Sequence, residues 1–415
     1  MKSPRLASLW LLAGVTLARG AGDLLDRVQD VLTWSVLEDR MRARVSGTID
    51  AEQYDLQRPV PGVIQTAGST LFSPRLAVFL DAQFGRHVYA FAQARADRGF
   101  DPGQEKFHAR LDEYAVRFTP WRDGRLSVQA GRFATVIGSW TARHGSWSDP
   151  FVTAPLPYEN LTGVWDAEAA RSSTALLAWS HVRPGLPAAI AATEKKLRIP
   201  IIWGPSYAAG VAASGALGRF TYAVEWKNAS LSSRPETWSE IDGDWAHPTM
   251  SARLGYRPNE MWNFGVSASD GTYLRPSALR TVVPGHRLGE YRERVLGQDI
   301  SFAWHYLQVW TEIYTTRFAI PLVGSADTLA YFVETKYKLT PQFFAAVRWN
   351  EQLFSTIPDR AGPVRWGHDV WRVDFAPGYR FTPHTQLKVQ YSLQHGDSGA
   401  RDYTSTLATQ FTVRF

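Results

Sequence analysis

Residues 138–160 bring together several side chains that could do chemistry. The stretch reads GSWTARHGSWSDPFVTAPLPYEN. His144, Ser146 and Asp149 are the residue types of a nucleophilic triad, but a triad is defined by geometry and not by closeness along the chain. The sequence contains no G-x-S-x-G elbow, no H-E-x-x-H pair and no cysteine. It therefore predicts no enzymatic activity, no metal site and no cofactor.

The segments around this stretch alternate apolar and polar residues with a period of two, which is typical of strands. In residues 75–84, Leu76, Val78 and Leu80 share one face, and Asp81 and Gln83 share the other. The same pattern recurs in hairpins with short turns. The predicted hairpins cover 75–98, 108–133, 205–228, 248–270, 327–351 and 367–394, and two with less defined turns cover 164–181 and 293–317.

Longer loops alternate with these short turns. They cover residues 55–72, 134–162, 182–204, 229–247, 271–291 and 352–366. Outer-membrane barrels show this alternation, with short periplasmic turns and long extracellular loops. The sequence therefore predicts an all-β fold over residues 40–415, a transmembrane antiparallel β-barrel of about 18 strands. Sixteen strands is the alternative, because of the two less defined hairpins.

The two ends of the chain carry their own patterns. Residues 1–20 have a basic start, an apolar run and small residues before position 21, which predicts a secretory signal peptide. Residues 21–39 are expected to form a short periplasmic leader with helical spacing. Residues 404–415 alternate and end on the aromatic Phe415. This resembles the C-terminal strand that the barrel assembly machinery recognises, so that machinery is an expected partner.

The polar face of the predicted strands would line the lumen. It carries both signs of charge, so two interpretations stay open: a basic ladder that guides anions, or cross-strand pairs that keep the wall hydrated. The pairs are favoured, because many strands place a basic and an acidic residue two positions apart. The predicted wall residues are Arg42, Arg44, Glu113, Arg117, Arg253, Arg257, Arg348, Arg372 and Lys388.

Within such a barrel, residues 134–162 have the length and irregularity of a loop that folds inward and narrows the channel. Pro150, Pro155 and Pro157 prevent regular strand pairing in this loop. The side chains expected to face the pore are Arg143, His144, Asp149, Tyr158 and Glu159. A lid over the barrel mouth is the alternative placement.

The segments DEYAVRFTP (112–120) and LSVQAGRFATVIG (126–138) resemble the porins. In particular, Gly131, Arg132, Phe133 and Gly138 are similar to a motif of the phosphate-selective porin O and P family. Val136 and Ile137 depart from that motif. The matched segments cover under a tenth of the chain. The resemblance implies a water-filled barrel, often trimeric, that passes small solutes.

These patterns together predict a porin of the bacterial outer membrane that allows passive diffusion of small hydrophilic solutes. Its expected surroundings are outer-membrane lipid and lipopolysaccharide, and a homotrimer is possible. The formal charge of +6 falls to about +3 without the predicted signal peptide, which gives no argument for a nucleic-acid partner. The alternative function is a plugged barrel whose surface loops bind or adhere.

Overall fold

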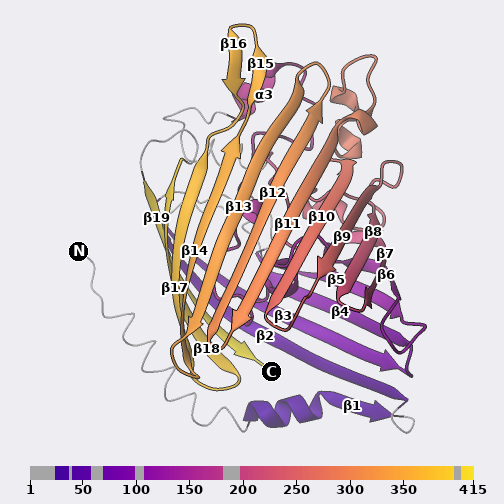
Figure 1. Cartoon of the computed structure of the whole chain (residues 1–415), viewed down its shortest axis with the longest axis vertical. Helices are drawn as coiled ribbons and strands as arrows, with labels where there is room; N and C mark the ends of the chain where they lie inside the picture. The colour runs from indigo at the N-terminus through magenta and orange to yellow at the C-terminus, as the bar shows by residue number, and fades with distance from the viewer. Residues whose placement is uncertain (1–23, 37–39, 58–68, 99–106, 181–196, 397–402) are drawn as a thin grey trace.

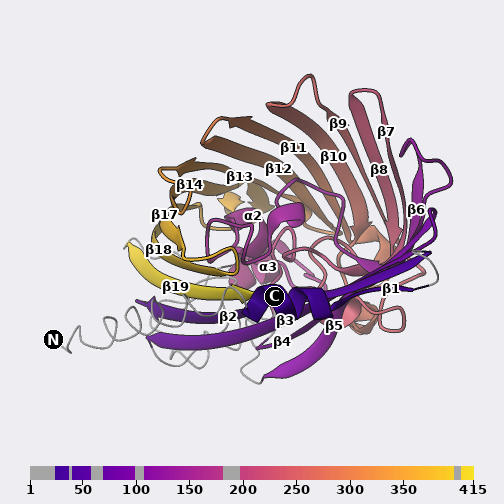
Figure 2. The same ribbon diagram turned by 90° about the horizontal axis from the view of Figure 1, so that it is seen from below.

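The chain forms one closed antiparallel barrel. The computed structural model describes residues 24–36, 40–57, 69–98, 107–180, 197–396 and 403–415. Sixteen strands follow one another around the ring, each paired with its neighbour in sequence, and β19 pairs with β2 to close it. Because the ring is closed, each of its strands pairs with a strand on either side, and no strand edge is left open (Figures 1 and 2).

The barrel strands vary from short to long around the ring. Their bounds are β2 Met41–Leu56, β3 Thr70–Phe84, β4 Val88–Asp97, β5 His108–Phe118, β6 Ser127–Phe133, β7 Ala208–Leu217, β8 Phe220–Lys227, β9 Thr249–Tyr256, β10 Trp262–Thr272, β11 Arg292–Trp304, β12 Leu307–Ile320, β13 Gly324–Lys338, β14 Phe343–Phe354, β17 Val370–Arg380, β18 Thr385–His395 and β19 Thr404–Arg414. Most long connections lie at the upper end of Figure 1 and the short turns at the lower end.

Two smaller elements extend this ring. Residues 24–31 are helical and lead into β1 (Thr33–Val36), which pairs with β2 beside the lower mouth of the barrel. At the opposite end, β15 (Thr356–Asp359) and β16 (Gly362–Arg365) form a hairpin within the connection between β14 and β17. No helix in the described ranges is long and apolar enough to cross a membrane.

The barrel has the lower of the two strand numbers that the sequence predicted. The hairpin expected over 164–181 is wrong, whereas the one expected over 293–317 forms as β11 and β12. Residues in the first of these regions instead form α3 (Ser173–Ser180), where the Ser172 hydroxyl accepts a hydrogen bond from the Ala175 amide. Alanine and leucine favour a helix, and this N-cap begins it, so helical propensity prevails over the apparent alternation.

This difference lengthens one connection. Residues 134–207, here called the inner loop, join β6 to β7 and contain α2 (Leu156–Glu159) and α3. Seen along the barrel, both helices lie within the ring of strands (Figure 2). The predicted segment 134–162 is therefore the first part of a longer inner loop, part of which (181–196) lies outside the described residues.

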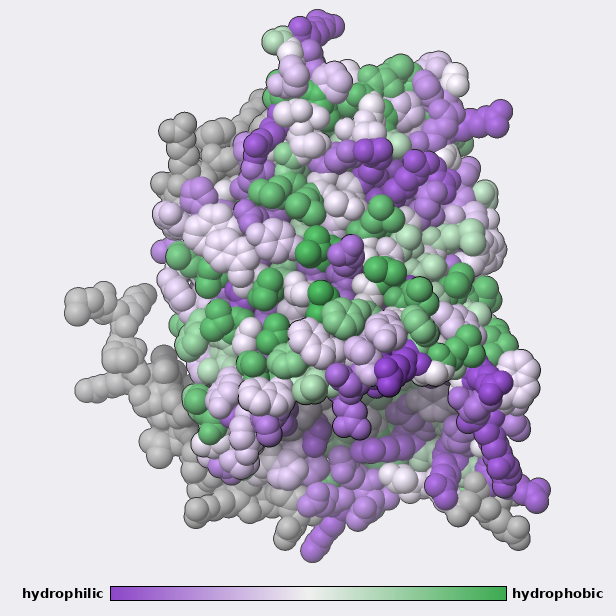
Figure 3. Space-filling model, viewed as in Figure 1, coloured by the Kyte–Doolittle hydropathy of each residue, from purple (hydrophilic) through white to green (hydrophobic). Residues whose placement is uncertain are grey.

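The strands divide their side chains between two environments. On β14, Arg348, Asn350 and Gln352 are buried, while Val347 and Trp349 are exposed. The same alternation places buried polar groups inside and exposed apolar groups outside along the long strands, such as β11 and β13. Figure 3 shows a band rich in hydrophobic side chains between two more hydrophilic ends. This is the surface expected of a barrel that contacts lipid.

Candidate pore and inner loop

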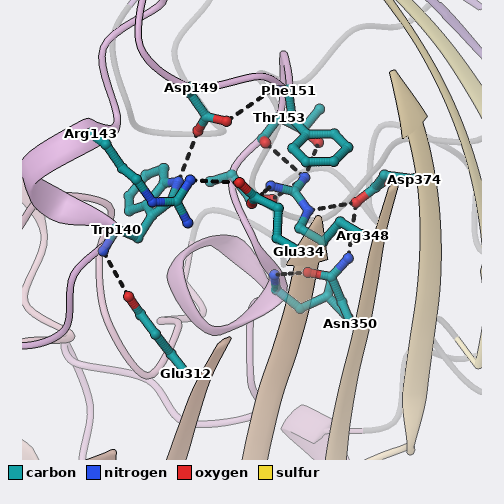
Figure 4. A network of polar contacts seen from close by, with 12 residues as sticks. Trp140, Arg143, Asp149, Phe151, Thr153, Glu312, Glu334, Arg348, Asn350 and Asp374 are labelled. Carbon is teal, nitrogen blue, oxygen red and sulfur yellow. Dashed lines mark hydrogen bonds and ion pairs between the residues drawn. The ribbon is translucent and has the colours of Figure 1, made fainter. Parts of the chain in front are cut away.

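Glu312 holds the first part of the inner loop against the barrel wall. Its Oε1 accepts hydrogen bonds from the Ser139 amide (2.7 Å), the Ser139 hydroxyl (2.8 Å) and the Trp140 amide (2.7 Å). Its Oε2 accepts bonds from the hydroxyls of Tyr158 and Tyr314. A fully buried carboxylate on β12 thus receives five donors, three of them from the start of the loop (Figure 4). These five hydrogen bonds offset the free-energy cost of burying the Glu312 carboxylate.

Gly138 makes this close approach possible. Its φ is +73°, in the left-handed region that favours glycine. A Cβ there would collide with the hydroxyls of Tyr314 and Tyr158 and with the Glu312 carboxylate. The glycine that contributed to the porin resemblance therefore has a physical role at the point where the loop turns onto β12.

Three cationic wall residues bind the next part of the loop. Lys388 Nζ donates to the carbonyls of Ser146, Asp149 and Phe151, each at 2.9 Å. Arg348 donates to the Thr153 carbonyl at 2.9 Å, and its guanidinium lies 4.1 Å from the centre of the Phe151 ring. These cations solvate backbone carbonyls that the irregular loop leaves without strand partners.

Arg372 continues the same pattern on β17. It donates to the Ala154 carbonyl at 2.6 Å and forms an ion pair with Glu159 of α2. Both Arg372 and Arg348 also contact Asp374, which links the two guanidiniums. Figure 4 shows the contact between Arg348 and Asp374. The predicted wall residues Arg348, Arg372 and Lys388 are thus buried groups that anchor the inner loop.

Arg143 points toward the wall. Its guanidinium donates to Glu334 of β13 at 2.6 Å and lies 4.4 Å from the centre of the Trp310 ring. It is absent from the lining of the cavity described below, whereas His144, Asp149, Tyr158 and Glu159 belong to that lining. The structure therefore separates Arg143 from the other four residues that the sequence placed at the pore.

The residues of a hypothetical triad do not meet. His144 Nδ1 lies 2.6 Å from the Thr141 carbonyl, and its Nε2 lies 2.8 Å from the Tyr207 hydroxyl. Asp149 accepts bonds from the Trp140 indole and the Phe151 amide. Burial lowers the pKa of His144 to about 4, and the nearby Arg95 contributes in the same direction. Among the described residues, no group of His, Asp or Glu is arranged to hold a metal ion.

A cavity of about 620 Å³ lies between the inner loop and the opposite wall. The loop side contributes residues within 134–161 and 200–205. The barrel side contributes mainly β2, β3 and β4, with Glu113 of β5 and Gln410 of β19. Arg75 of β3 lies in this wall, with its Nε 3.0 Å from Asp50 and a second contact to Glu52. Arg95 lies 3.4 Å from Asp112 and near Asp97. The inner loop therefore makes most of its polar contacts with β12 to β18 and fewer with β5 and β8. A cavity remains between the loop and β2 to β4.

Apart from Glu113, the remaining predicted wall residues lie away from the loop anchors. Glu113 lines the cavity and accepts the Ala134 amide, and Arg253 forms an ion pair with Asp299. Arg117 donates to Gln129, and Arg42 and Arg44 are exposed on β2 near the short turns. Arg257 lies just beyond the end of β9, in a turn.

The principal cavity cation, Arg75, was not among the predicted site residues. Its position was readable in the sequence, because it shares the strand face of Asp81 and Gln83, which the alternation assigned to the lumen. Glu312 lay on a predicted lumen face in the same way. Nothing in the local sequence of Glu312 indicates that it binds the inner loop. Nothing in the local sequence of Arg75 indicates that it faces the open space.

Comparisons with known proteins show which solved structures have a similar fold. No protein-family model matches the chain, and no curated protein matches it by sequence. The structure is similar to a loop-deletion mutant of OmpT, an outer membrane protein of Vibrio cholerae, with a TM-score of 0.56 and 9% identity over 91% of this chain and 100% of that one.

Two further solved structures are similar to it. Salmonella typhi OmpF, in complex with daunomycin, has a TM-score of 0.54 and 10% identity over 92% of this chain and all of that one. The anion-selective porin from Comamonas acidovorans has a TM-score of 0.52 and 9% identity over 90% and 100% of the two chains. At these identities the likeness concerns architecture alone, and the chain has the porin-like β-barrel fold of outer-membrane proteins.

Proposed function

We propose that the protein is a diffusion channel of the bacterial outer membrane for small hydrophilic solutes, narrowed by its inner loop. One observation carries this proposal: the loop binds the wall formed by β12 to β18, and a cavity of about 620 Å³ remains beside β2 to β4. A plug would instead be expected to fill this space. A barrel of this strand number has room for an aqueous passage unless it is filled.

The lining of the proposed passage places charged groups among apolar and aromatic side chains. Asp50, Glu52, Asp97 and Glu159 line it together with Arg75. These carboxylates form ion pairs with Arg75, Arg110 and Arg372, which offsets part of their negative charge. A general route for small polar solutes fits this lining better than a phosphate-selective one, because Arg348 and Lys388 are occupied by loop carbonyls.

The test is single-channel recording of the refolded or membrane-extracted protein in a planar bilayer. The expected result is a set of discrete, ohmic conductance steps. Truncating the anchor with Glu312→Ala should make these steps larger and noisier, because five hydrogen bonds to that carboxylate are lost. Glu351→Ala is the matched control. The Glu351 carboxylate accepts a hydrogen bond from the Tyr331 hydroxyl and lies on the outer face of β14, away from the inner loop.

A well-folded barrel that gives no conductance steps would contradict the channel and support the plugged barrel. We also propose a homotrimer as the assembly. Its motivation is that one similar structure, OmpT of Vibrio cholerae, is described in a trimer form. Light scattering of the detergent-purified protein tests the trimer separately from the conductance.

A further inference from the structure

We infer that the outer face of β10 to β13 carries a binding site for the phosphorylated head of an acylated glycolipid, the lipid A class of the outer leaflet. This inference rests on the proposed outer-membrane location. It concerns a surface that the channel does not use.

A row of four charged side chains crosses these strands at their loop ends. Asp270 pairs in register with Arg294, Arg294 with Arg317, and Arg317 with Asp327. All four belong to the outward face, because their neighbours in sequence, such as Glu293 and Thr316, are buried inside. Two arginines therefore stand directly opposite each other on the outer surface. Like charges in such positions repel, which favours a bound anion between them.

The carboxylates in the row do not satisfy all the guanidiniums. Arg317 binds Asp327 through two contacts of 2.8 Å. Asp270 accepts a bond from Arg292 at 2.8 Å, whereas Arg294 Nε lies 3.7 Å from the same oxygen, beyond hydrogen-bond distance. Three arginines thus share two carboxylates. The side chains of Arg294 and Arg317 are 59% and 54% exposed, so both can reach a ligand.

Leucines are the largest side chains on the surface beneath the arginine pair. The next register row toward the short turns contains Leu296, Thr315 and Leu329. A hollow of about 560 Å³ extends from the arginine row to the leucines beneath it. Its lining includes Arg294 and Arg317 at the upper end and Leu296, Leu329 and Leu353 at the lower end. Figure 3 shows hydrophilic side chains gathered over the upper ends of these strands, above the more hydrophobic band.

This arrangement defines the ligand by its chemistry. A guanidinium pair binds phosphate oxygens through paired N–H groups, which suits a phosphate monoester better than a zwitterionic head. The leucines below the arginine pair offer an apolar surface for acyl chains that run along the strands into the bilayer. The site lies at the long-loop end of the barrel, which is the extracellular side in this fold. A phosphorylated glycolipid with several acyl chains satisfies all three conditions.

The experiment measures binding of purified lipid A to the folded protein in detergent by native mass spectrometry. Two lipids are compared, one with both phosphates and one enzymatically dephosphorylated. The test variant is Arg294→Gln with Arg317→Gln. The control variant, Arg125→Gln with Arg219→Gln, removes two exposed arginines in the short turns. Inorganic phosphate is added as a competitor in a separate series.

We expect the phosphorylated lipid to bind the wild type and the control variant alike, and the test variant at least tenfold more weakly. Equal binding of both lipids, or no difference between the two variants, would overturn the inference. Displacement by millimolar inorganic phosphate would also overturn it, because the site would then recognise the free anion. A barrel that conducts but does not bind the lipid refutes this site alone, and one that binds but does not conduct refutes the channel alone.

Discussion

At the scale of residues, the charges inside the barrel act mainly as local partners. Arg253 pairs with Asp299, Arg75 with Asp50, and Arg348 with Asp374 across neighbouring or nearby strands. These contacts agree with the pairing interpretation of the lumen charges more than with an unbroken basic ladder. Other cations bind carbonyls of the inner loop, a use that strand alternation does not indicate.

Arg75 provides a test of charge in the proposed passage. In Arg75→Gln, Asp50 and Glu52 lose their shared cation. The reversal potential in a salt gradient should therefore shift toward cation preference, and the shift should vanish near 1 M salt, where the Debye length is about 3 Å. Arg125→Gln, in an exposed turn, should leave the reversal potential unchanged. An unchanged potential in Arg75→Gln would place the ion path elsewhere.

His144 provides a test of pH. Its pKa is lowered from 6.5 to about 4 by burial, so the folded state holds the neutral ring. Between these two values the unfolded chain binds more protons than the folded one, and stability must fall as the pH drops from about 6.5 to about 4. Thermal unfolding followed by circular dichroism should show this loss in the wild type.

His144→Gln is the matching variant. Glutamine does not titrate, so the stability of this variant should depend less on pH across the same window. The difference between the two proteins, and not the absolute melting temperature, is the quantity to compare. Parallel pH profiles would show that His144 is not buried in the neutral form.

At the scale of elements, the inner loop is held by a turn that only glycine accepts. Gly138→Ala should lower the free energy of unfolding by about 1–3 kcal/mol, because it adds a left-handed alanine and a clash with two tyrosine hydroxyls. Gly145→Ala is the matched control, since a Cβ there meets nothing within 4 Å. Urea unfolding of both variants measures the difference. Equal stabilities would mean that the loop does not pack on β12 through this turn.

At the scale of the whole molecule, β19 and β2 close the barrel along their length, and one rung of this closure lies near the lower end. The Gly47 and Phe415 backbones exchange hydrogen bonds of 2.9 and 3.0 Å, and a Cβ at Gly47 would enter the Phe415 ring. Gly47→Leu should therefore destabilise the closed barrel by about 2 kcal/mol or more through the two lost bonds.

The measurement for this variant is the fraction of compact, heat-modifiable barrel after refolding. Ile49→Leu, on the exposed face of the same strand, is the control and should refold like the wild type. Refolding of Gly47→Leu at the wild-type yield would show that this rung does not limit closure.

The sequence by itself determined the class of fold and most of its strands. A period of two requires only that each side chain face either lipid or lumen, and this requirement is local. It therefore placed β3 with β4 and β13 with β14 correctly, and it placed the last strand, β19, at the C-terminal end of the chain. It also located the start of the inner loop, because Pro150, Pro155 and Pro157 cannot continue a strand ladder.

Only the tertiary structure decided where the inner loop lies and which charges it occupies. Residues 164–180 join the loop instead of the wall, because a local helix can pack inside the ring. Arg348 and Lys388 look like pore residues in sequence, yet they bind carbonyls of residues 195 and 239 positions away. Such contacts depend on the closed ring bringing distant segments together, and no periodicity within one strand carries that information.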